Sequence, residues 1–349
     1  MTTVAIDVAP PRSASVRVTR VIDETRDAKS FAFTVPDDRC RDFAYRPGQF
    51  VTLRIPSDRD GSVARCYSLS SCPATDVELV VTVKRTSRGY GSNWLCDNIS
   101  EGDVIDILPP AGVFTPASLD DDLLLWGAGS GITPLVSIIK ATLASGSGHV
   151  ALVYANRDAD SVIFGDELRD LQTRHPNRLT VIHWLEAERQ IPTADQLAEL
   201  ASPYAVRHSF ICGPAGFMTI AREALGRIGT PRSHVHAEVF ASLSGDPFAA
   251  RVPEPAADPD AATVEVDADG QTYTIGWPRS QTLLDAMLTR GLDVPFSCRE
   301  GQCGTCAAVV VEGEVTMADA GVLDDDDLAE GYVLACQSRP KGAFARIRF

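Results

Sequence analysis

Three cysteines lie close together near the C-terminal end of the sequence, in the stretch CREGQCGTCAAVVVEGEV that begins at Cys298. Their spacing is Cys298-x4-Cys303-x2-Cys306, and a fourth thiol, Cys336, follows further along the chain. Four thiolates at this spacing are typical of a plant-type two-iron, two-sulfur (2Fe-2S) cluster. A structural zinc site usually pairs its cysteines as C-x2-C twice, and four unrelated buried thiols are the other alternative. We therefore predict that these four cysteines hold a one-electron 2Fe-2S relay.

A second set of chemically suitable residues lies in the N-terminal third of the chain. The sequence RCYSLSS places Arg65 and Tyr67 on one side of a predicted strand and Ser68 on the other. A cation, an aromatic ring and a hydroxyl suit the phosphate, the ring face and the ring edge of a flavin. The following stretch GYGSNWL adds flexible backbone at Gly91. Ser92 can donate to a phosphate and is expected to open a helix, SNWLCDN, whose N-terminus favours an anion. The motif is short, so an ordinary strand containing a tyrosine is the alternative.

The sequence GAGSGITP follows an apolar run and opens a predicted helix. Its glycines, Gly127, Gly129 and Gly131, allow a pyrophosphate to approach the helix N-terminus, for which we expect Thr133 as N-cap and Pro134 as the first residue. The spacing differs from the usual G-x-G-x-x-G, so a tight strand–helix turn without a ligand is the alternative.

Two further stretches bear on a nicotinamide coenzyme. In CGPAGFM, Gly213 and Pro214 end a predicted strand, and Cys212 is either close to the nicotinamide or a packed core thiol. After the second strand of this region, ANRDADS offers Arg157 for a 2′-phosphate and Asp158 for a ribose hydroxyl. The residues alone therefore leave NADH and NADPH open.

Composition narrows the class of protein. The 349 residues carry a formal net charge of −15 and are 44% hydrophobic, which is ordinary for a globular enzyme and argues against a nucleic-acid partner. No apolar run is long enough for a membrane span, and the N-terminus shows no secretory signal, so we expect a cytoplasmic protein that does not bind membranes. The odd number of cysteines, nine, argues against a disulfide framework.

The pattern of predicted elements indicates three domains. Residues 12–118 contain six short strands rich in Val, Ile, Phe and Thr, which predicts a small antiparallel β-barrel. Residues 119–240 alternate strands and helices, which predicts an α/β nucleotide-binding domain with a parallel sheet. Residues 241–262 are rich in Pro, Ala and Asp and are expected to be a linker. Residues 263–349 open with a predicted hairpin and helix and then carry the cysteines.

The motifs together resemble two known families. The patterns R-x-Y-S-x-x-S, G-x-x-S-x-x-L, G-x-G-x-G-I-T-P and CGPAGFM resemble the ferredoxin–NADP reductase superfamily over roughly residues 15–240. That resemblance implies flavin contacts from Arg65, Tyr67, Ser68 and Ser92, with Lys84, Tyr90 and Gly91 added from their positions beside the motifs. It also implies that Phe240 stacks on the flavin, where a core aromatic is the alternative. Residues 263–349 are similar to chloroplast-type ferredoxins, which implies a β-grasp fold.

The domain order is similar to that of reductase components of bacterial ring-attacking oxygenases. This resemblance implies FAD rather than FMN, NADH as the donor, and a Rieske-type terminal oxygenase, one that hydroxylates a steroid ring, as the acceptor. Hydride transfer is expected beside Ser68, Cys212 and Phe240, and the acidic stretch LDDDDLAEG is expected to face the oxygenase. Reductases of other oxygenases, such as an epoxidase or a ring-hydroxylating dioxygenase, and an electron carrier or redox sensor without NADH turnover, are the alternatives.

Overall fold

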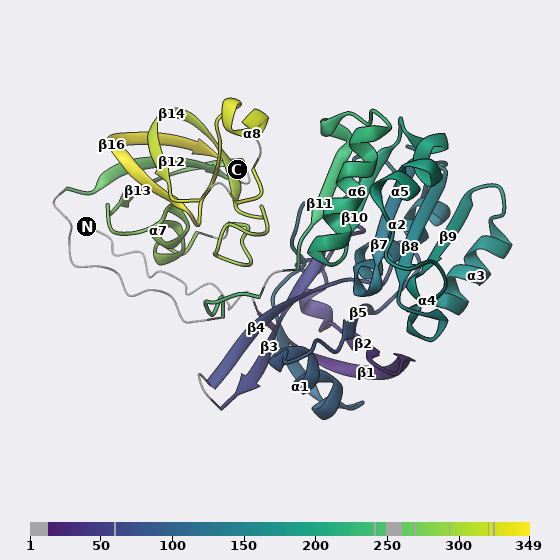
Figure 1. The fold of residues 1–349 in the computed structure, drawn as a ribbon. Helices are drawn as coiled ribbons and strands as arrows, with labels where there is room; N and C mark the ends of the chain where they lie inside the picture. Colours follow the sequence, from purple (N-terminus) through teal and green to yellow (C-terminus); the bar gives the residue numbers. More distant parts are fainter. Residues whose placement is uncertain are drawn as a thin grey trace.

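The computed structural model describes residues 13–58, 61–240, 242–248, 260–268, 270–292, 294–319, 321–323 and 325–349. They form three domains in chain order, a barrel, a parallel sheet with helices on both faces, and a smaller C-terminal domain (Figure 1). No helix among the described residues is both long and apolar enough to cross a membrane.

The first domain is a six-stranded antiparallel barrel with the strand order β4-β3-β6-β1-β2-β5. Its strands are β1 (Ala14–Thr25), β2 (Ala28–Thr34), β3 (Phe50–Ser57), β4 (Gly61–Ser68), β5 (Leu79–Lys84) and β6 (Val104–Ile107). Alternate residues of β1, beginning with Ala14, Val16 and Val18, are buried in the barrel core, as a period of two requires. A bridge between Leu69 and Val81 joins the end of β4 to β5 and closes the barrel.

The second domain has a five-stranded parallel sheet with the order β11-β10-β7-β8-β9. Its strands are β7 (Leu123–Ala128), β8 (Val150–Asn156), β9 (Leu179–Leu185), β10 (His208–Cys212) and β11 (Val235–Glu238). The helices are α2 (Ile132–Ser145), α3 (Gly165–Arg174), α4 (Glu186–Arg189), α5 (Ala194–Ala201) and α6 (Ala215–Arg227). Buried side chains of α2 and α3 pack on one face of the sheet, and those of α5 and α6 pack on the other.

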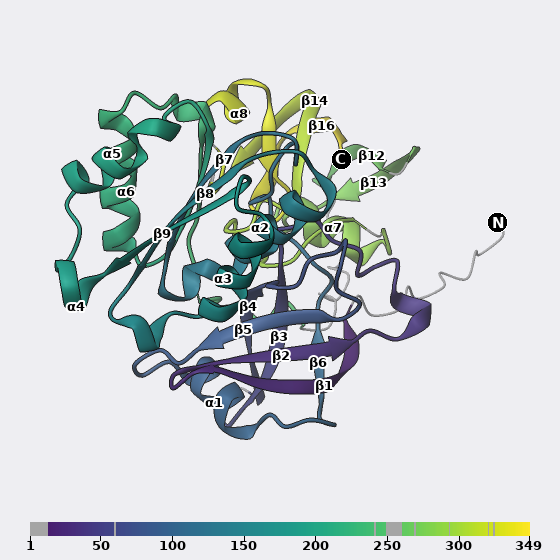
Figure 2. The same cartoon turned by 90° about the vertical axis from the view of Figure 1, so that its right-hand side faces the viewer.

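The third domain is a mixed five-stranded sheet with the order β13-β12-β16-β14-β15. Its strands are β12 (Ala262–Ala268), β13 (Gln271–Trp277), β14 (Ala307–Met317), β15 (Tyr332–Leu334) and β16 (Ser338–Arg348). Strands β12 and β16 are parallel, and the other pairs are antiparallel. Helix α7 (Leu283–Thr289) buries its leucines against Trp277, and the short α8 (Asp325–Ala329) precedes β15. The view in Figure 2 places this domain beside the parallel sheet and above the barrel.

Two predicted helix starts are wrong, and one strand was not predicted. Helix α2 has Gly131 as its N-cap because the glycine loop continues as a 3-10 turn, so Thr133 lies inside the helix and its hydroxyl donates to the Ser130 carbonyl (3.0 Å). Helix α1 (Tyr90–Asn98) begins two residues before Ser92. Strand β11 was not predicted because its four residues are only partly buried and carry no clear alternation.

Gly131 marks the closest backbone approach between the glycine loop and strand β10. A Cβ atom built on Gly131 would lie 2.0 Å from the carbonyl oxygen of Cys212. Contacts that short do not occur between real atoms, so one of the two backbone segments must move if any side chain is added. The glycine therefore fixes how closely the loop after β7 can pack against the end of β10.

We predict that Gly131→Ala destabilises the protein by about 1–3 kcal/mol, because the added methyl forces backbone to shift in a packed region. Gly216→Ala is the matched control, since a Cβ at Gly216 in α6 meets nothing within 4 Å and alanine favours helix by about 1 kcal/mol over glycine. Scanning calorimetry should show a lower thermal midpoint for the first variant and an equal or higher one for the second. Equal midpoints in both variants would contradict the close approach.

Candidate functional site

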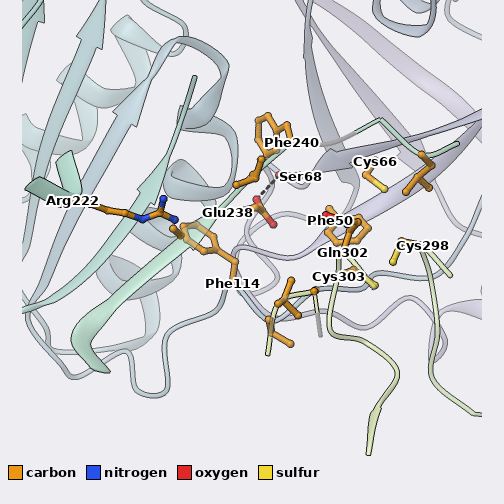
Figure 3. A pocket seen from close by; sticks show the side chains of 17 residues that line it. Phe50, Cys66, Ser68, Phe114, Arg222, Glu238, Phe240, Cys298, Gln302 and Cys303 are labelled. Atoms are coloured by element: carbon orange, nitrogen blue, oxygen red, sulfur yellow. Dashed lines mark hydrogen bonds between the residues drawn. The ribbon is translucent and has the colours of Figure 1, made fainter. Parts of the chain in front are cut away.

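A cavity of about 350 Å³ lies where the three domains meet (Figure 3). The barrel contributes Phe50, Cys66 and Ser68, and the C-terminal domain contributes Cys298 and Cys303. The remaining wall comes from Arg222 of α6, the segment from Ala237 to Phe240, and the loop residues Gly112, Val113, Phe114, Leu243, Gln302, Gly321 and Val322. Ser68 and Phe240, which are predicted for hydride transfer, therefore share one cavity with the cluster cysteines Cys298 and Cys303. Cys212, the third residue predicted for hydride transfer, is not part of the cavity lining.

Ser68 and Glu238 form the polar centre of this cavity. The Ser68 hydroxyl, at the end of β4, donates to the Glu238 carboxyl at 3.1 Å, as Figure 3 shows. Burial raises the pKa of Glu238 to about 8, and the hydrogen bond from Ser68 opposes the rise only in part. The carboxyl is therefore protonated at neutral pH and can give or take a proton beside Ser68. Glu238 was not predicted from the sequence; the available signal was an acid two residues before Phe240, at the end of a strand.

Phe240 and Cys212 have different environments. Phe240 follows β11, lines the cavity and is 48% exposed, so its ring is free to cover a ligand. Cys212 pairs in register with Glu238 but is fully buried in the core of the second domain, where burial raises the pKa of its thiol. The role of Phe240 stays a prediction. Cys212 was predicted to lie either close to the nicotinamide or in the core, and its surroundings are those of a core thiol.

The other face of β4 suits a flavin diphosphate. Arg65 and Tyr67 lie on the face opposite Ser68, and a Cβ on Gly91 would lie 2.9 Å from Cγ of Arg65, so the guanidinium stem crosses the first turn of α1. Ser92, also in that turn, is buried and accepts a hydrogen bond from the Thr86 N–H (3.1 Å). A cation beside a helix N-terminus is an anion-binding arrangement, so these residues fit the phosphates of FAD. The hydroxyl of nearby Tyr90 donates to the Pro56 carbonyl (2.7 Å).

The edge of the parallel sheet suits a dinucleotide. Gly127 lies near the end of β7, where an added Cβ would lie 3.1 Å from Leu135 and 3.4 Å from Tyr154, and Gly129 follows with a φ of 54°. Lys84 of the barrel lies over this loop, its Nζ 3.6 Å from a Cβ built on Gly129. Gly213 packs against Ala128 on the other side, and Pro214 is the N-cap of α6. Pro134 is the third residue of α2 and not its first, as predicted, because the helix already begins at Ile132. Arg157 follows β8 and forms an ion pair with the barrel. These binding roles stay predictions.

The four cluster cysteines (Cys298, Cys303, Cys306 and Cys336) are 1–6% exposed and meet as two pairs. Cys298 contacts Cys303, and Cys306 contacts Cys336, through hydrogen bonds between thiols that lower the pKa of Cys303 and Cys336 and raise that of their partners. Within the described residues, no three metal-binding side chains surround a single point. Two pairs are what a two-iron cluster needs, because its four thiolates are shared between two irons.

The backbone around the four cluster cysteines also fits a bound 2Fe-2S cluster. Gly301 and Gly304 have φ values of 76° and 69°, which glycine adopts without strain. The Glu300 N–H donates to the sulfur of Cys298 (3.4 Å). N–H groups that point at sulfur stabilise negative charge there, so the residues present fit a reducible 2Fe-2S cluster.

Direct contacts seat the cluster loop on the barrel. The hydroxyls of Thr52 and Ser297 are 3.0 Å apart, and the Gly112 N–H donates to the Thr305 hydroxyl (3.1 Å). A further contact comes from the segment that follows the second domain, where the backbone and the hydroxyl of Ser244 donate to Glu300 (both 2.8 Å). Beneath these contacts, Cys298 and Cys303 pack in one apolar cluster with Phe50, Ala64, Ala111 and Leu243. The first cysteine pair therefore faces the flavin domain.

Three family profiles match the chain in the same order as the three domains. Residues 15–115 match the oxidoreductase FAD-binding domain, and residues 125–223 match the oxidoreductase NAD-binding domain. Residues 266–341 match the 2Fe-2S iron-sulfur cluster binding domain. Each of the three predicted cofactors, FAD, NAD and the 2Fe-2S cluster, therefore has a matching binding domain in the chain.

Individual relatives cover nearly the whole chain. The ferredoxin reductase component of 3-ketosteroid-9-alpha-monooxygenase from Rhodococcus rhodochrous is 58% identical, covering 100% of both chains. The glycine betaine monooxygenase reductase from Pseudomonas aeruginosa is 33% identical, covering 94% of this chain and 93% of its own. The structure of phthalate dioxygenase reductase covers 97% of this chain and 98% of its own, with a TM-score of 0.57 and 27% identity.

The order of the three domains agrees with the coverage of these relatives along nearly the full length of the chain. A chain that joins FAD-binding, NAD-binding and 2Fe-2S domains can take a pair of electrons from NADH and deliver single electrons to an oxygenase. The chain belongs to the family of oxygenase reductase components that includes the ferredoxin reductase component of 3-ketosteroid-9-alpha-monooxygenase.

Proposed function

We propose that this chain is the NADH-dependent reductase of a Rieske-type terminal oxygenase that hydroxylates a 3-ketosteroid at the 9α position. The single observation that carries the reductase role is the cavity shared by Ser68, Phe240 and the first cysteine pair. The steroid is supported by the name of the 58% identical relative, whereas the glycine betaine relative is only 33% identical. The Rieske type of the oxygenase rests on the resemblance of the motifs.

The residues of the chain have distinct tasks in this proposal. Arg65, Tyr67 and Ser92 would hold FAD, which when bound accepts a hydride and passes on electrons singly, and the four cluster cysteines would hold the 2Fe-2S centre. The Ser68 hydroxyl and the protonated Glu238 keep a proton next to the reacting ring edge. Phe240 covers the cavity and keeps water out until the nicotinamide displaces its ring.

Two alternatives lead to different observations. A reductase of another oxygenase would have the same cavity, because the partner is recognised by the outer surface and not by the flavin site. A carrier without NADH turnover would not need a coenzyme site, which the match of residues 125–223 to an NAD-binding domain argues against. The cytoplasm remains the proposed compartment, since none of the nine cysteines, all of which lie among the described residues, forms a disulfide, as is usual in a reducing environment.

The proposed docking surface for the oxygenase is the region of α8. Asp325, Asp326 and Glu330 are exposed there beside the half-exposed apolar side chains of Val322 and Leu328. Val322 also lines the cavity, so this surface is continuous with the wall that holds the first cysteine pair. A charged rim around apolar residues attracts a basic partner and excludes water at the contact.

We predict that Cys303→Ser removes electron transfer beyond the flavin but leaves the NADH-to-ferricyanide reaction intact. Steroid 9α-hydroxylation, reconstituted with purified oxygenase and a 3-ketosteroid, should fall by about 100-fold or more, because one cluster ligand is lost. Cys40→Ser is the control, since Cys40 is an exposed thiol outside the cavity lining. If Cys303→Ser abolishes both reactions equally, a separate relay is not supported; if wild type supports no hydroxylation, the oxygenase assignment fails.

We predict that flavin reduction by NADH slows several-fold as the pH rises from neutral through about 8. The carboxyl of Glu238 ionises as pH rises through about 8, and its negative charge disfavours transfer of a hydride into the same cavity. Glu238→Gln keeps an uncharged hydrogen-bonding group, so its stopped-flow rate should be flat across this range. Because the folded pKa lies above the ordinary value of 4.5, this carboxyl ionises first in the unfolded chain, so the wild type loses stability as pH rises from about 4.5 to about 8. An identical pH profile in both proteins would rule out Glu238 as the titrating group.

We predict that Asp325→Asn combined with Glu330→Gln raises the KM for the oxygenase several-fold and weakens the salt dependence of hydroxylation. The ferricyanide rate should not change, because these side chains lie outside the cavity lining. Glu199→Gln in α5 is the control for removal of an exposed charge elsewhere. A wild-type KM that does not depend on ionic strength would contradict electrostatic docking.

A further inference from the structure

A carboxylate from the barrel reaches the edge of the parallel sheet where the coenzyme is expected. Asp27 lies in the turn between β1 and β2, and its Oδ2 is 2.9 Å from Nη2 of Arg157, which directly follows β8. The Asp27 side chain is mostly covered (23% exposed), whereas that of Arg157 is half exposed. Figure 2 shows β1 and β2 lying under the second domain, so the ion pair joins two domains.

The same carboxylate also faces Lys84. Nζ of Lys84 is 3.9 Å from Oδ2 of Asp27, and it lies over Gly129 in the loop that suits a pyrophosphate. Burial lowers the pKa of Lys84, Asp27 acts in the opposite direction, and Arg157 lowers it further. Lys84 and Arg157 at the coenzyme edge therefore share the carboxylate of Asp27, which offsets the repulsion between them, while the smaller effects of Asp158 and Arg26 on Lys84 oppose each other.

Asp158, the acid that directly follows Arg157, is already engaged within the second domain. It accepts a hydrogen bond from the Ser161 N–H (2.9 Å) and caps the 3-10 turn Ala159–Ser161 in a reciprocal capping box. Asn156 at the end of β8 is 4% exposed, and within the described residues its amide makes no hydrogen bond of normal geometry. In dinucleotide-binding sheets this region meets the adenosine ribose, where an acid favours NADH and a free arginine accommodates the 2′-phosphate of NADPH.

We propose that Asp27 of the flavin barrel is the residue that sets the preference for NADH, because it occupies Arg157 and Lys84 and so leaves neither cation free for a 2′-phosphate. This inference rests on the proposed function, since it requires a nicotinamide coenzyme at the edge of the sheet. Asp27 is a positioning residue that acts through Arg157 and Lys84.

The charges explain why the effect is selective. A 2′-phosphate carries between one and two negative charges, so it is repelled by Asp27 unless it displaces that carboxylate from both cations. A ribose hydroxyl is neutral and leaves the ion pairs in place. Removing the charge of Asp27 should therefore improve binding of a ligand that carries a 2′-phosphate far more than binding of one with a free 2′-hydroxyl.

The test is calorimetric titration of the FAD-loaded full chain with 2′-phospho-AMP and with AMP. Asp27→Asn keeps the size of the side chain and the oxygen that accepts from the Thr25 hydroxyl (2.9 Å). We expect 2′-phospho-AMP to bind about fivefold tighter than to wild type, AMP to stay within about twofold, and the gain to shrink in high salt. The ratio of kcat/KM for NADPH to that for NADH, with ferricyanide as acceptor, should rise by a similar factor. Adding Arg157→Ala should remove the gain.

Asp23→Asn is the matched control, because Asp23 lies in β1 of the same hairpin and pairs with the surface lysine Lys29 (3.3 Å). It should leave both affinities and the coenzyme ratio unchanged. An unchanged ratio in Asp27→Asn, or equal tightening of AMP and 2′-phospho-AMP, would overturn the inference. Failure of the proposed function is recognised separately, as a wild-type protein that reduces ferricyanide with neither coenzyme.

Discussion

The packing of the cluster loop against the barrel is the contact on which the rest of the architecture depends. Hydride arrives as a pair of electrons and the cluster takes one, so the two centres must share a boundary that water does not fill. The hydroxyl contact between Thr52 and Ser297 and the bond from Gly112 to Thr305 set that boundary. The apolar cluster beneath them places Cys298 and Cys303 against Phe50, whose ring lines the same cavity as Ser68.

A second constraint positions Glu238 within the nucleotide domain. The backbone of Gly131 touches that of Cys212, and Cys212 lies in register with Glu238 on β11. A shift of either strand would therefore move Glu238 away from Ser68. This dependence explains why a fully buried thiol outside the cavity lining still bears on the site: its backbone sets the position of the acid.

Elements with a strong local signal could be predicted from the sequence. These elements are the barrel strands, the alternating strands and helices of the second domain, and the four cluster cysteines. Each depends on a pattern of residues that can be recognised in the sequence alone. Thr133 was misplaced because cap preference competes with a glycine loop that already turns helically. Glu238 and Asp27 were missed for another reason. Each acquires its role only from a partner in another domain, Ser68 or Arg157, and no local pattern records such a contact.

Glu238 and Asp27 are both carboxylic acids, but their different surroundings give them different roles. Glu238 meets a hydroxyl in the cavity wall, so burial dominates and the group keeps its proton, adding no negative charge to the reaction space at neutral pH. Asp27 meets two cations at an open edge, where its charge is compensated. A cavity without a carboxylate charge favours entry of a hydride, whereas a compensated edge disfavours an extra phosphate. Both acids bridge the barrel and the nucleotide domain, so docking of these two domains determines the reactivity of the site and its selectivity together.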